Sequence, residues 1–399
     1  MAYARFMGGT PADKAGAHDR APRRSRAVRP PWRMVVDAQG VVRRAPRQLG
    51  RRVVQGVWRR AAARYRRRRI LPPGRSHQEP TAGRTAAPAA PPDRLRWVIA
   101  TAVPSARVGD RWGDWHLAHA LRRSLERLGQ DVVVQTLEDA GSRESEARDV
   151  KLVLRGLASI ERNPGQRHVL WLISHPEAVD LAECEAADLV VVASPRFAAH
   201  LRERVTTPVE VLLQATDAER FFPRPPMAAH QHPVTVVAKS RDVLRGAVVD
   251  AIEAGLEPAV YGGGWRGRVD RRLVVASHVA NEALPIVYSS AGVVLNDHWE
   301  AMRTWGFVSN RIFDVLACGT PVISDDLPEL RELFDGAVLT YRSSTELREL
   351  VAAVLADREA SRAVAATGRA AVLARHTFDH RARELLDLAV RHGLIDGER

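Results

Sequence analysis

One short stretch of this chain limits strongly the folds that it can adopt. Residues 291–295 (AGVVL) form a short, uncharged and partly β-branched run, which predicts a buried strand. A polar loop is expected next, and Ser309 is a good N-cap for a helix whose body, 312–318, is almost wholly apolar. Gly319 ends this helix, and a further short apolar run predicts another buried strand. The stretch is therefore expected to form a parallel α/β unit.

Polar residues gather at the start of the predicted helix. Four of them lie within little more than one turn: Ser309, Asn310, Arg311 and Asp314. Asn310 and Asp314 share a face because of their i,i+4 spacing. In open α/β sheets, ligands bind beyond the carboxyl ends of the strands, and the first N–H groups and the dipole of a helix favour a phosphate. The pattern predicts a phosphate-containing ligand, and the alternative is an Arg311–Asp314 ion pair that only caps a core helix.

The net charge is distributed unevenly along the 399 residues. Residues 1–92 carry 22 Lys and Arg against 4 Asp and Glu, a net charge of +18, whereas residues 93–399 carry a net charge of −5. Binding to a nucleic-acid backbone needs a basic patch on the folded domain, so this distribution argues against a nucleic-acid-binding protein. Residues 93–399 are numerous enough for two domains of ordinary size.

Residues 1–92 are rich in Arg, Pro and Ala and are expected to be mostly disordered. Within them, Arg51 to Ile70 has the pattern of a basic amphipathic helix with an aromatic edge, which is typical of segments that contact a membrane surface or an acidic partner. The alternatives are a solvated disordered tail and a chain that truly starts at Met34.

The two cysteines, Cys184 and Cys318, lie far apart without a CxxC spacing, which favours reduced thiols in a cytoplasmic protein. No apolar run approaches the roughly 18 residues of a membrane span, and the N-terminus lacks the apolar core of a signal peptide. We therefore expect a cytoplasmic protein that is not exported. If Arg51 to Ile70 binds a membrane, the protein lies peripherally at its inner face.

From Leu95 onward, short apolar runs alternate with amphipathic segments. In the first half, strands are expected at 96–103, 131–137, 150–154, 168–173, 188–194 and 209–214, with helices at 110–128 and 195–205. In the second half, strands are expected at 234–239, 257–265, 273–279 and 291–295, with helices at 241–253 and 281–289. This alternation predicts an α/β fold of two Rossmann-like domains, 93–222 and 223–399, that face a cleft. The segment 374–386 is expected to pack against the body, with packing back across the domain junction as one option.

Polar residues also follow two strands of the first half. The first strand leads into Gly109 to Leu121, where glycines permit close backbone approach and Asp110, Asp114 and His116 surround a helix start. The GxGxxG spacing of dinucleotide sites is absent. We expect one of these three residues to contact an acceptor, and the alternative for Asp114 is a role as N-cap. His175 follows another buried strand, a position that favours function.

Basic residues follow the first strand of the second half. Lys239, Arg241 and Arg245 are expected at the same cleft edge as Ser309, where they would neutralise a diphosphate. The alternative is solvated surface charge. Gly263, the middle of three consecutive glycines, fits either a close backbone approach or a turn.

Four segments together resemble CgeB-like glycosyltransferases, within the group-1 glycosyltransferases of the GT-B fold: residues 296–326, VYGGGW, QATDAERFFP and ARHTFDHRA. The resemblance implies a nucleotide-sugar donor held mainly by the second domain, an acceptor held mainly by the first, no cofactor and no required metal. It also favours a retaining transfer. In the wider group two Glu residues with seven residues between them mark the donor site, and Asp314 matches the second, which contacts the ribose. The first acid has no clean counterpart, and Glu300 and Asp297 are the candidates to replace it.

The function expected from the residues and the resemblance is transfer of a sugar from a nucleotide sugar to a hydroxyl of an unidentified glycan, lipid or protein. The diphosphate is expected near Ser309 to Arg311 and Lys239 or Arg241, with the ribose on Asp314 and with Gly263, Asp297 and His298 nearby. The acceptor hydroxyl is expected to lose its proton to Asp110, Asp114, His116 or His175, or to the leaving phosphate. One rival hypothesis is a nucleotide-sugar epimerase. The other is a non-catalytic scaffold of a cell-surface or spore-assembly system, and the missing first acid favours this scaffold.

Overall fold

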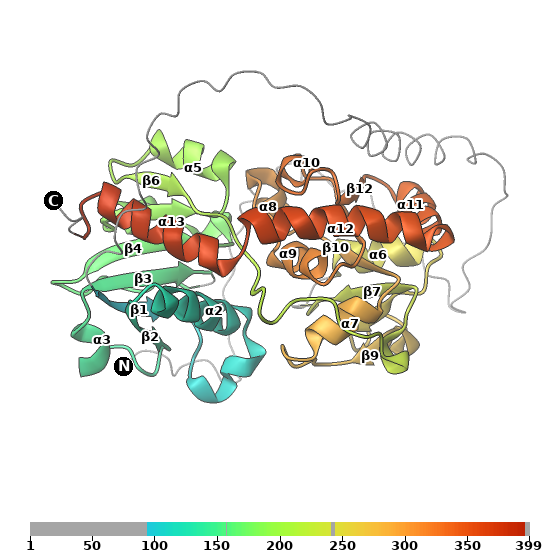
Figure 1. Ribbon diagram of the computed structural model, residues 1–399, viewed down its shortest axis with the longest axis horizontal. Helices are drawn as coiled ribbons and strands as arrows, with labels where there is room; N and C mark the ends of the chain where they lie inside the picture. The colour runs from blue at the N-terminus through green and yellow to red at the C-terminus, as the bar shows by residue number, and fades with distance from the viewer. Residues whose placement is uncertain (1–93, 157, 241–243, 396–399) are drawn as a thin grey trace, which may run out of the picture. The chain divides into compact units, whose positions relative to one another are not determined.

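The computed structural model describes residues 94–156, 158–240 and 244–395, which form two parallel β-sheets flanked by helices (Figure 1). This confirms the expected α/β class with two Rossmann-like domains. The predicted tail 1–92, its segment Arg51 to Ile70, and Arg241 lie outside the described residues. Among the helices of the described residues, none is both long and apolar enough to cross a membrane.

The first domain is built on a six-stranded sheet with the order β2-β1-β3-β4-β5-β6, and all neighbouring strands are parallel. Its strands are β1 (Arg96–Ala100), β2 (Asp131–Gln135), β3 (Val150–Arg155), β4 (Arg167–Leu172), β5 (Leu189–Val192) and β6 (Val209–Val211). Its helices are η1 (Ala106–Arg111), α2 (Gly113–Arg127), α3 (Arg143–Glu146), η2 (Pro176–Ala178), α4 (Leu181–Glu185) and α5 (Pro195–Arg202). The chain reverses direction across the sheet between β1 and β3, which makes the carboxyl ends of these two strands a natural ligand position.

The second domain repeats this plan with the strand order β12-β11-β10-β7-β8-β9, again parallel throughout. Its strands are β7 (Val234–Val237), β8 (Ala259–Tyr261), β9 (Val274–Ala276), β10 (Val293–Asn296), β11 (Val322–Asp325) and β12 (Leu339–Tyr341). Its helices are η3 (Ala228–His230), α6 (Gly246–Glu253), η4 (Arg271–Leu273), α7 (Leu284–Ser290), α8 (Glu300–Trp305), α9 (Asn310–Ala317), α10 (Glu329–Leu333), α11 (Ser344–Ala356) and α12 (Arg358–Arg375). Here the strand order reverses between β7 and β10.

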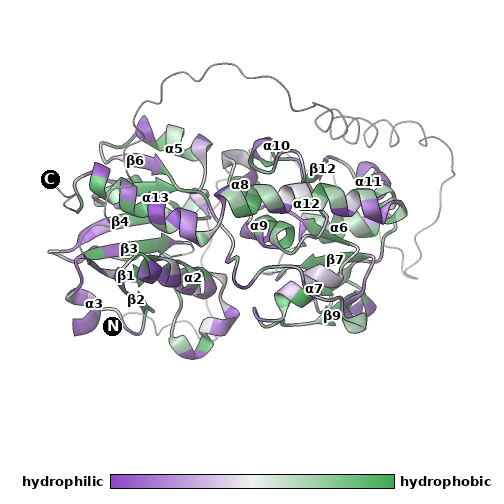
Figure 2. Cartoon of the chain, in the orientation of Figure 1, coloured by the Kyte–Doolittle hydropathy of each residue, from purple (hydrophilic) through white to green (hydrophobic). Residues whose placement is uncertain are grey.

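Hydrophobic residues concentrate on the strands of both sheets, and the helices that cover them also carry hydrophilic residues (Figure 2). Every residue of β3 and β10 is buried, because helices cover both faces of a parallel sheet. The α9 helix is equally enclosed, with all residues from Ile312 to Ala317 buried. Burial of this kind holds the elements that carry the polar residues described below in fixed positions.

The last helix, α13 (Phe378–Arg391), belongs to the first domain by its packing. It lies beside α2 (Figure 1). Its apolar residues join the core that α2 and the first sheet form, with Phe378, Leu385 and Leu386 among them. The segment before α13 pairs with the segment that leaves the first domain: the N–H of Thr216 donates to His376 O at 3.0 Å, and the N–H of Phe378 donates to Thr216 O at 3.1 Å. The second domain was expected to extend to residue 399, but its last helix packs in the core of the first domain.

Two segments differ from the structure expected for them. The polar loop expected between β10 and α9 contains the short helix α8, which ends at Gly306 with a φ of 73°. The helix expected to begin at residue 241 begins at Gly246. Gly319, with a φ of 71°, ends α9 as predicted, because glycine adopts this left-handed conformation without strain.

Candidate active site

A cleft of about 520 Å³ lies between the two sheets, lined by residues of both domains. On one side it meets the loops that follow β1, β3 and β4, and on the other the segments after β7 and β8 and the starts of α7 and α9. Eight of the predicted site residues line it: Asp110, Asp114, His116, His175, Lys239, Asn310, Arg311 and Asp314. Four predicted residues do not line it: Gly263, Asp297, His298 and Ser309.

Asp314 is the most constrained acid of the cleft. Its carboxyl is buried, accepts a hydrogen bond from Thr216 Oγ at 2.7 Å, and accepts another from Asn310 Nδ2 at 3.0 Å. Burial raises the pKa of Asp314 to about 8, against the opposing effect of the Thr216 hydrogen bond. The amide oxygen of Asn310 is buried without a partner in the described part of the chain. The predicted shared face of Asn310 and Asp314 is thus present. Through Thr216 it is tied to the crossover segment, residues 212–226, which connects the two domains.

Arg311 reaches back along the sheet instead of pairing with its helical neighbour. Its guanidinium donates to Asn296 Oδ1 at 2.7 Å, at the carboxyl end of β10, and burial lowers its pKa. The described residues show no Arg311–Asp314 ion pair of the kind that would only cap a core helix. Arg311 therefore places a half-buried positive charge at the helix start, where the first N–H groups of α9 have no intrahelical partner.

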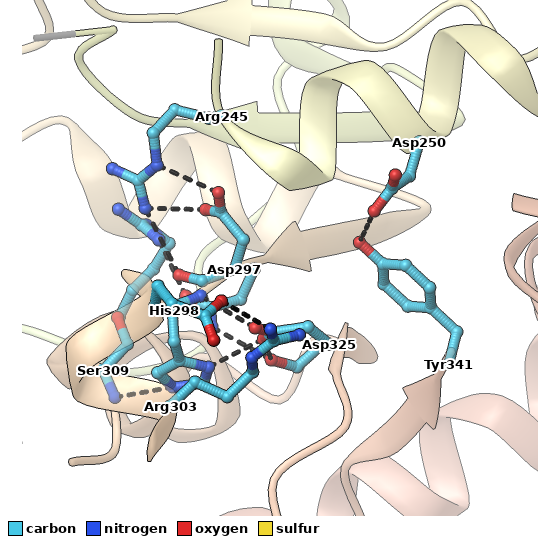
Figure 3. Close-up of polar contacts among 12 residues, drawn as sticks. Arg245, Asp250, Asp297, His298, Arg303, Ser309, Asp325 and Tyr341 are labelled. Atoms are coloured by element: carbon cyan, nitrogen blue, oxygen red, sulfur yellow. Dashed lines mark hydrogen bonds and ion pairs between the residues drawn. The ribbon is translucent and has the colours of Figure 1, made fainter. Parts of the chain in front are cut away.

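His298 and Asp325 hold the start of α9 from behind, as Figure 3 shows. His298 Nδ1 lies 2.7 Å from Asp325 Oδ1, and the N–H of Ser309 donates to His298 Nε2 at 3.0 Å. Because Nε2 accepts, Nδ1 carries the proton and donates to the carboxylate. Burial opposes ionisation of Asp325, but the His298 contacts outweigh it and lower its pKa. The His298 side chain is 0% exposed and does not line the cleft. It therefore positions the helix start, and the direct contact with a nucleotide sugar predicted for it is absent from this arrangement.

Asp297 is likewise occupied inside the protein. It forms a two-pronged ion pair with Arg245, with Nε to Oδ2 at 2.9 Å and Nη2 to Oδ1 at 2.7 Å (Figure 3). The Arg245 guanidinium also lies over the Trp299 ring, 4.5 Å from its centroid. Arg245 lines the cleft and Asp297, for which a ligand contact was predicted, does not.

The glycines after β8 bring two backbone segments together. Gly262 has a φ of 138°, and a Cβ added to it would lie 2.1 Å from Ala238 O. This favours the close-approach interpretation of the glycine run, although Gly262 lines the cleft and the predicted Gly263 does not. The neighbouring Lys239 donates from Nζ to Arg111 O at 2.8 Å, which links the second domain to the η1 loop of the first.

The first-domain face of the cleft is formed by the loop after β1. The N-cap of α2 is Trp112, so Asp114 does not have the alternative N-cap role. Asp114 lies instead against Gly156 at the end of β3, where an added Cβ would be 3.0 Å from Asp114 Oδ2. His116 Nε2 contacts Asp110 O at 2.9 Å and thereby steadies the η1 loop.

His175 has an uncommon backbone conformation for a residue with a side chain. Its φ of 55° and ψ of 53° lie in the left-handed region, where non-glycine residues are strained and cluster at functional sites. Its Nδ1 lies 2.9 Å from Glu177 Oε1. A histidine oriented through Nδ1 by a carboxylate is a suitable proton acceptor at Nε2.

Sequence reasoning missed the residues that support the site across long sequence separations. Thr216 contacts Asp314 across 98 positions, and Asp325 contacts His298 across 27. Asn296 had a usable signal, because it is a polar residue at the end of a buried strand. The described residues contain no group of three or more His, Cys, Asp or Glu arranged to hold a metal ion.

Residues 243–387, which cover most of the second domain, match the family model described as "Glycosyl transferase-like". No curated protein matches the chain. The match agrees, for this segment, with the resemblance seen in the sequence, and it does not single out the CgeB-like branch.

Solved structures share the two-domain fold at low identity. Sucrose-phosphate synthase (tll1590) from Thermosynechococcus elongatus aligns with a TM-score of 0.54 and 16% identity, over 74% of this chain and 98% of that chain. Anabaena Alr3699/HepE in complex with UDP and glucose aligns with a TM-score of 0.51 and 13% identity, over 75% of this chain and 100% of that chain. T4 phage BGT in complex with its UDP-glucose substrate aligns with a TM-score of 0.53 and 10% identity, over 76% of this chain and 100% of that chain. The chain therefore has the GT-B fold of these proteins.

Proposed function

We propose that this protein is a glycosyltransferase that moves a sugar from a nucleotide-sugar donor to an acceptor hydroxyl. The observation that carries the proposal is the start of α9, where Asn310, Arg311 and Asp314 line the cleft within the segment that matches a glycosyltransferase family. Structural neighbours were solved with UDP, glucose or UDP-glucose, which supports a nucleotide sugar as the donor here.

The donor is assigned to the second-domain face of the cleft. Its diphosphate lies against the first N–H groups of α9, near the half-buried Arg311 and the buried Arg245, with Lys239 at the edge. Asp314 receives the ribose hydroxyls, because its carboxyl is the acid of this helix that lines the cleft. Asp325 and His298 contribute indirectly by fixing the helix start.

In the proposed reaction, the bond between the anomeric carbon and the diphosphate oxygen breaks, and a bond from the acceptor oxygen to that carbon forms. The positive groups at α9 stabilise the negative charge that develops on the leaving diphosphate. The acceptor proton passes to the leaving phosphate or to a base on the first-domain face, where His175, Asp110, Asp114 and His116 line the cleft. Retention at the anomeric carbon, independence from metal and membership of the CgeB-like branch belong to this proposal, and they rest on the resemblance.

A thermal-shift screen of nucleotide sugars, followed by product analysis, tests the proposal. A donor present at 100 times its Kd stabilises a folded protein by about 2.7 kcal/mol, enough to raise its melting temperature measurably. We expect at least one nucleotide sugar to raise the melting temperature of the wild type and to leave Arg311→Ala unchanged. Release of nucleoside diphosphate then supports transfer, a changed sugar without an acceptor indicates an epimerase, and binding without any product indicates a scaffold.

A further inference from the structure

A second cavity, of about 320 Å³, lies in the second domain outside the cleft. Three arginines from two separate segments line it: Arg224 in the crossover segment, and Arg358 and Arg362 one turn apart at the start of α12. None of the described residues that line it is Asp or Glu. The cavity therefore combines concentrated positive charge with walls that carry no compensating carboxylate.

None of these arginines forms an ion pair within the described residues; Arg358 and Arg362 are exposed, and Arg224 is half-buried. Arg224 stacks on the Phe222 ring, with Cζ 3.6 Å from the centroid, and this contact orients the guanidinium without neutralising it. The adjacent carboxylate of Asp357 accepts the N–H of Ala360 at 3.0 Å and does not line the cavity. Guanidinium groups that share a cavity repel one another, and a bound anion removes this repulsion.

Three prolines restrict the backbone of part of the cavity wall. Proline residues Pro223, Pro226 and Pro321 line it together with Gly319, where an added Cβ would lie 3.5 Å from Pro223. The cavity is bounded by Cys318 and Gly319, which directly follow α9, whereas the first turn of that helix faces the cleft. The two cavities thus lie at opposite ends of an eight-residue helix and share none of their lining residues.

We infer that this cavity is a second binding site, for a small soluble anion that carries a phosphate or diphosphate group. Guanidinium groups match the geometry of phosphate oxygens and form paired hydrogen bonds with them. Polar hydroxyls in the walls are engaged elsewhere, as Ser361 Oγ donates to Asp357 O at 2.7 Å, so the arginines provide the recognition. The inference depends on the second cavity alone and does not require the proposed glycosyl transfer.

Calorimetric titration with pyrophosphate at physiological salt tests the inference, using wild type, Arg311→Ala, and the double variant Arg358→Ser/Arg362→Ser. The matched control is Arg348→Ser/Arg391→Ser, which removes the same charge from exposed residues outside both cavities. We expect Arg311→Ala to retain pyrophosphate binding at the second cavity. The Arg358→Ser/Arg362→Ser variant should weaken this binding at least tenfold, and the Arg348→Ser/Arg391→Ser control should leave it unchanged.

Three results would overturn the inference. One is a single binding event that Arg311→Ala abolishes, and another is equal weakening by the control pair, which would indicate nonspecific charge. The third is binding to phosphatidic acid vesicles without binding to pyrophosphate, which would assign the arginines to a lipid surface. Failure of nucleotide-sugar binding in the cleft would leave the expected difference between the two double variants intact, so the two proposals fail separately.

Discussion

The two faces of the cleft are built differently. On the second-domain face, hydrogen bonds hold the polar residues in place. Asp314 is 8% exposed and hydrogen-bonded to Thr216 and Asn310, and His298 and Asp325 fix the start of α9. The first-domain face is held by loop contacts, with Asp110 exposed and the Glu177 side chain 52% exposed. A preformed face suits a constant nucleotide diphosphate, whereas an open loop face suits an acceptor that differs between related proteins. The predictions below test whether this division is real.

The largest effect is expected from Asp314→Ala. The substitution removes the carboxyl assigned to the ribose and leaves the Thr216 hydroxyl and the Asn310 amide without their partner. A hydrogen bond to a neutral group contributes about 0.5–1.5 kcal/mol, so loss of two bonds from the ribose hydroxyls should lower donor affinity on the order of 10- to 100-fold. Calorimetry measures the loss, circular dichroism controls for folding, and undiminished affinity would remove Asp314 from the donor site.

The pH dependence of stability should differ between wild type and Asp314→Asn. Folded Asp314 keeps its proton up to about pH 8, whereas the unfolded chain releases it near 3.8. Between these values the folded state binds more protons, so its stability relative to the asparagine variant falls as the pH rises. The slope is about 1.4 kcal/mol per pH unit, measurable by urea denaturation between pH 5 and 7. A difference between the two proteins that does not change with pH would show that burial does not keep Asp314 protonated.

A smaller loss of donor affinity, about tenfold, is expected from Asp325→Asn. The two carboxylate oxygens of Asp325 accept hydrogen bonds from the Nδ1 and the backbone N–H of His298. An asparagine has only one side-chain oxygen that can accept them. Disturbing His298 loosens its hold on the N–H of Ser309 and so disorders the helix start that receives the diphosphate. The matched control is Asp326→Asn, whose residue pairs with the exposed Arg342 instead. Equal affinities for the Asp325 and Asp326 variants would limit His298 and Asp325 to a role in folding.

The smallest effect on donor binding is expected on the first-domain face. Asp110→Ala should change donor affinity less than twofold, because Asp110 is exposed and contributes its backbone oxygen to His116. Its effect should appear instead in the acceptor KM, once an acceptor is known. A drop in donor affinity as large as that of Asp314→Ala would contradict the division between the two faces.

The sequence pattern predicted what depends on neighbouring residues. The β10–α9–β11 unit, the Gly319 stop and the shared face of Asn310 and Asp314 follow from helical spacing and short buried strands, and all are present. The supporting contacts of His298 and Asp314 were not predictable, because their partners are brought together only by the parallel sheet and by the crossing segments. Asp297 was assigned to the ligand for the same reason, since its partner Arg245 lies 52 positions away.

The central claim is that the start of α9 binds a nucleoside diphosphate, and calorimetric titration of the wild type with a panel of nucleoside diphosphates tests it most directly. We expect one-to-one binding of at least one member at the cleft, lost in Arg311→Ala and retained in the Arg358→Ser/Arg362→Ser variant. Absence of binding by every member to a folded wild type, or binding that Arg311→Ala leaves unchanged, would contradict it.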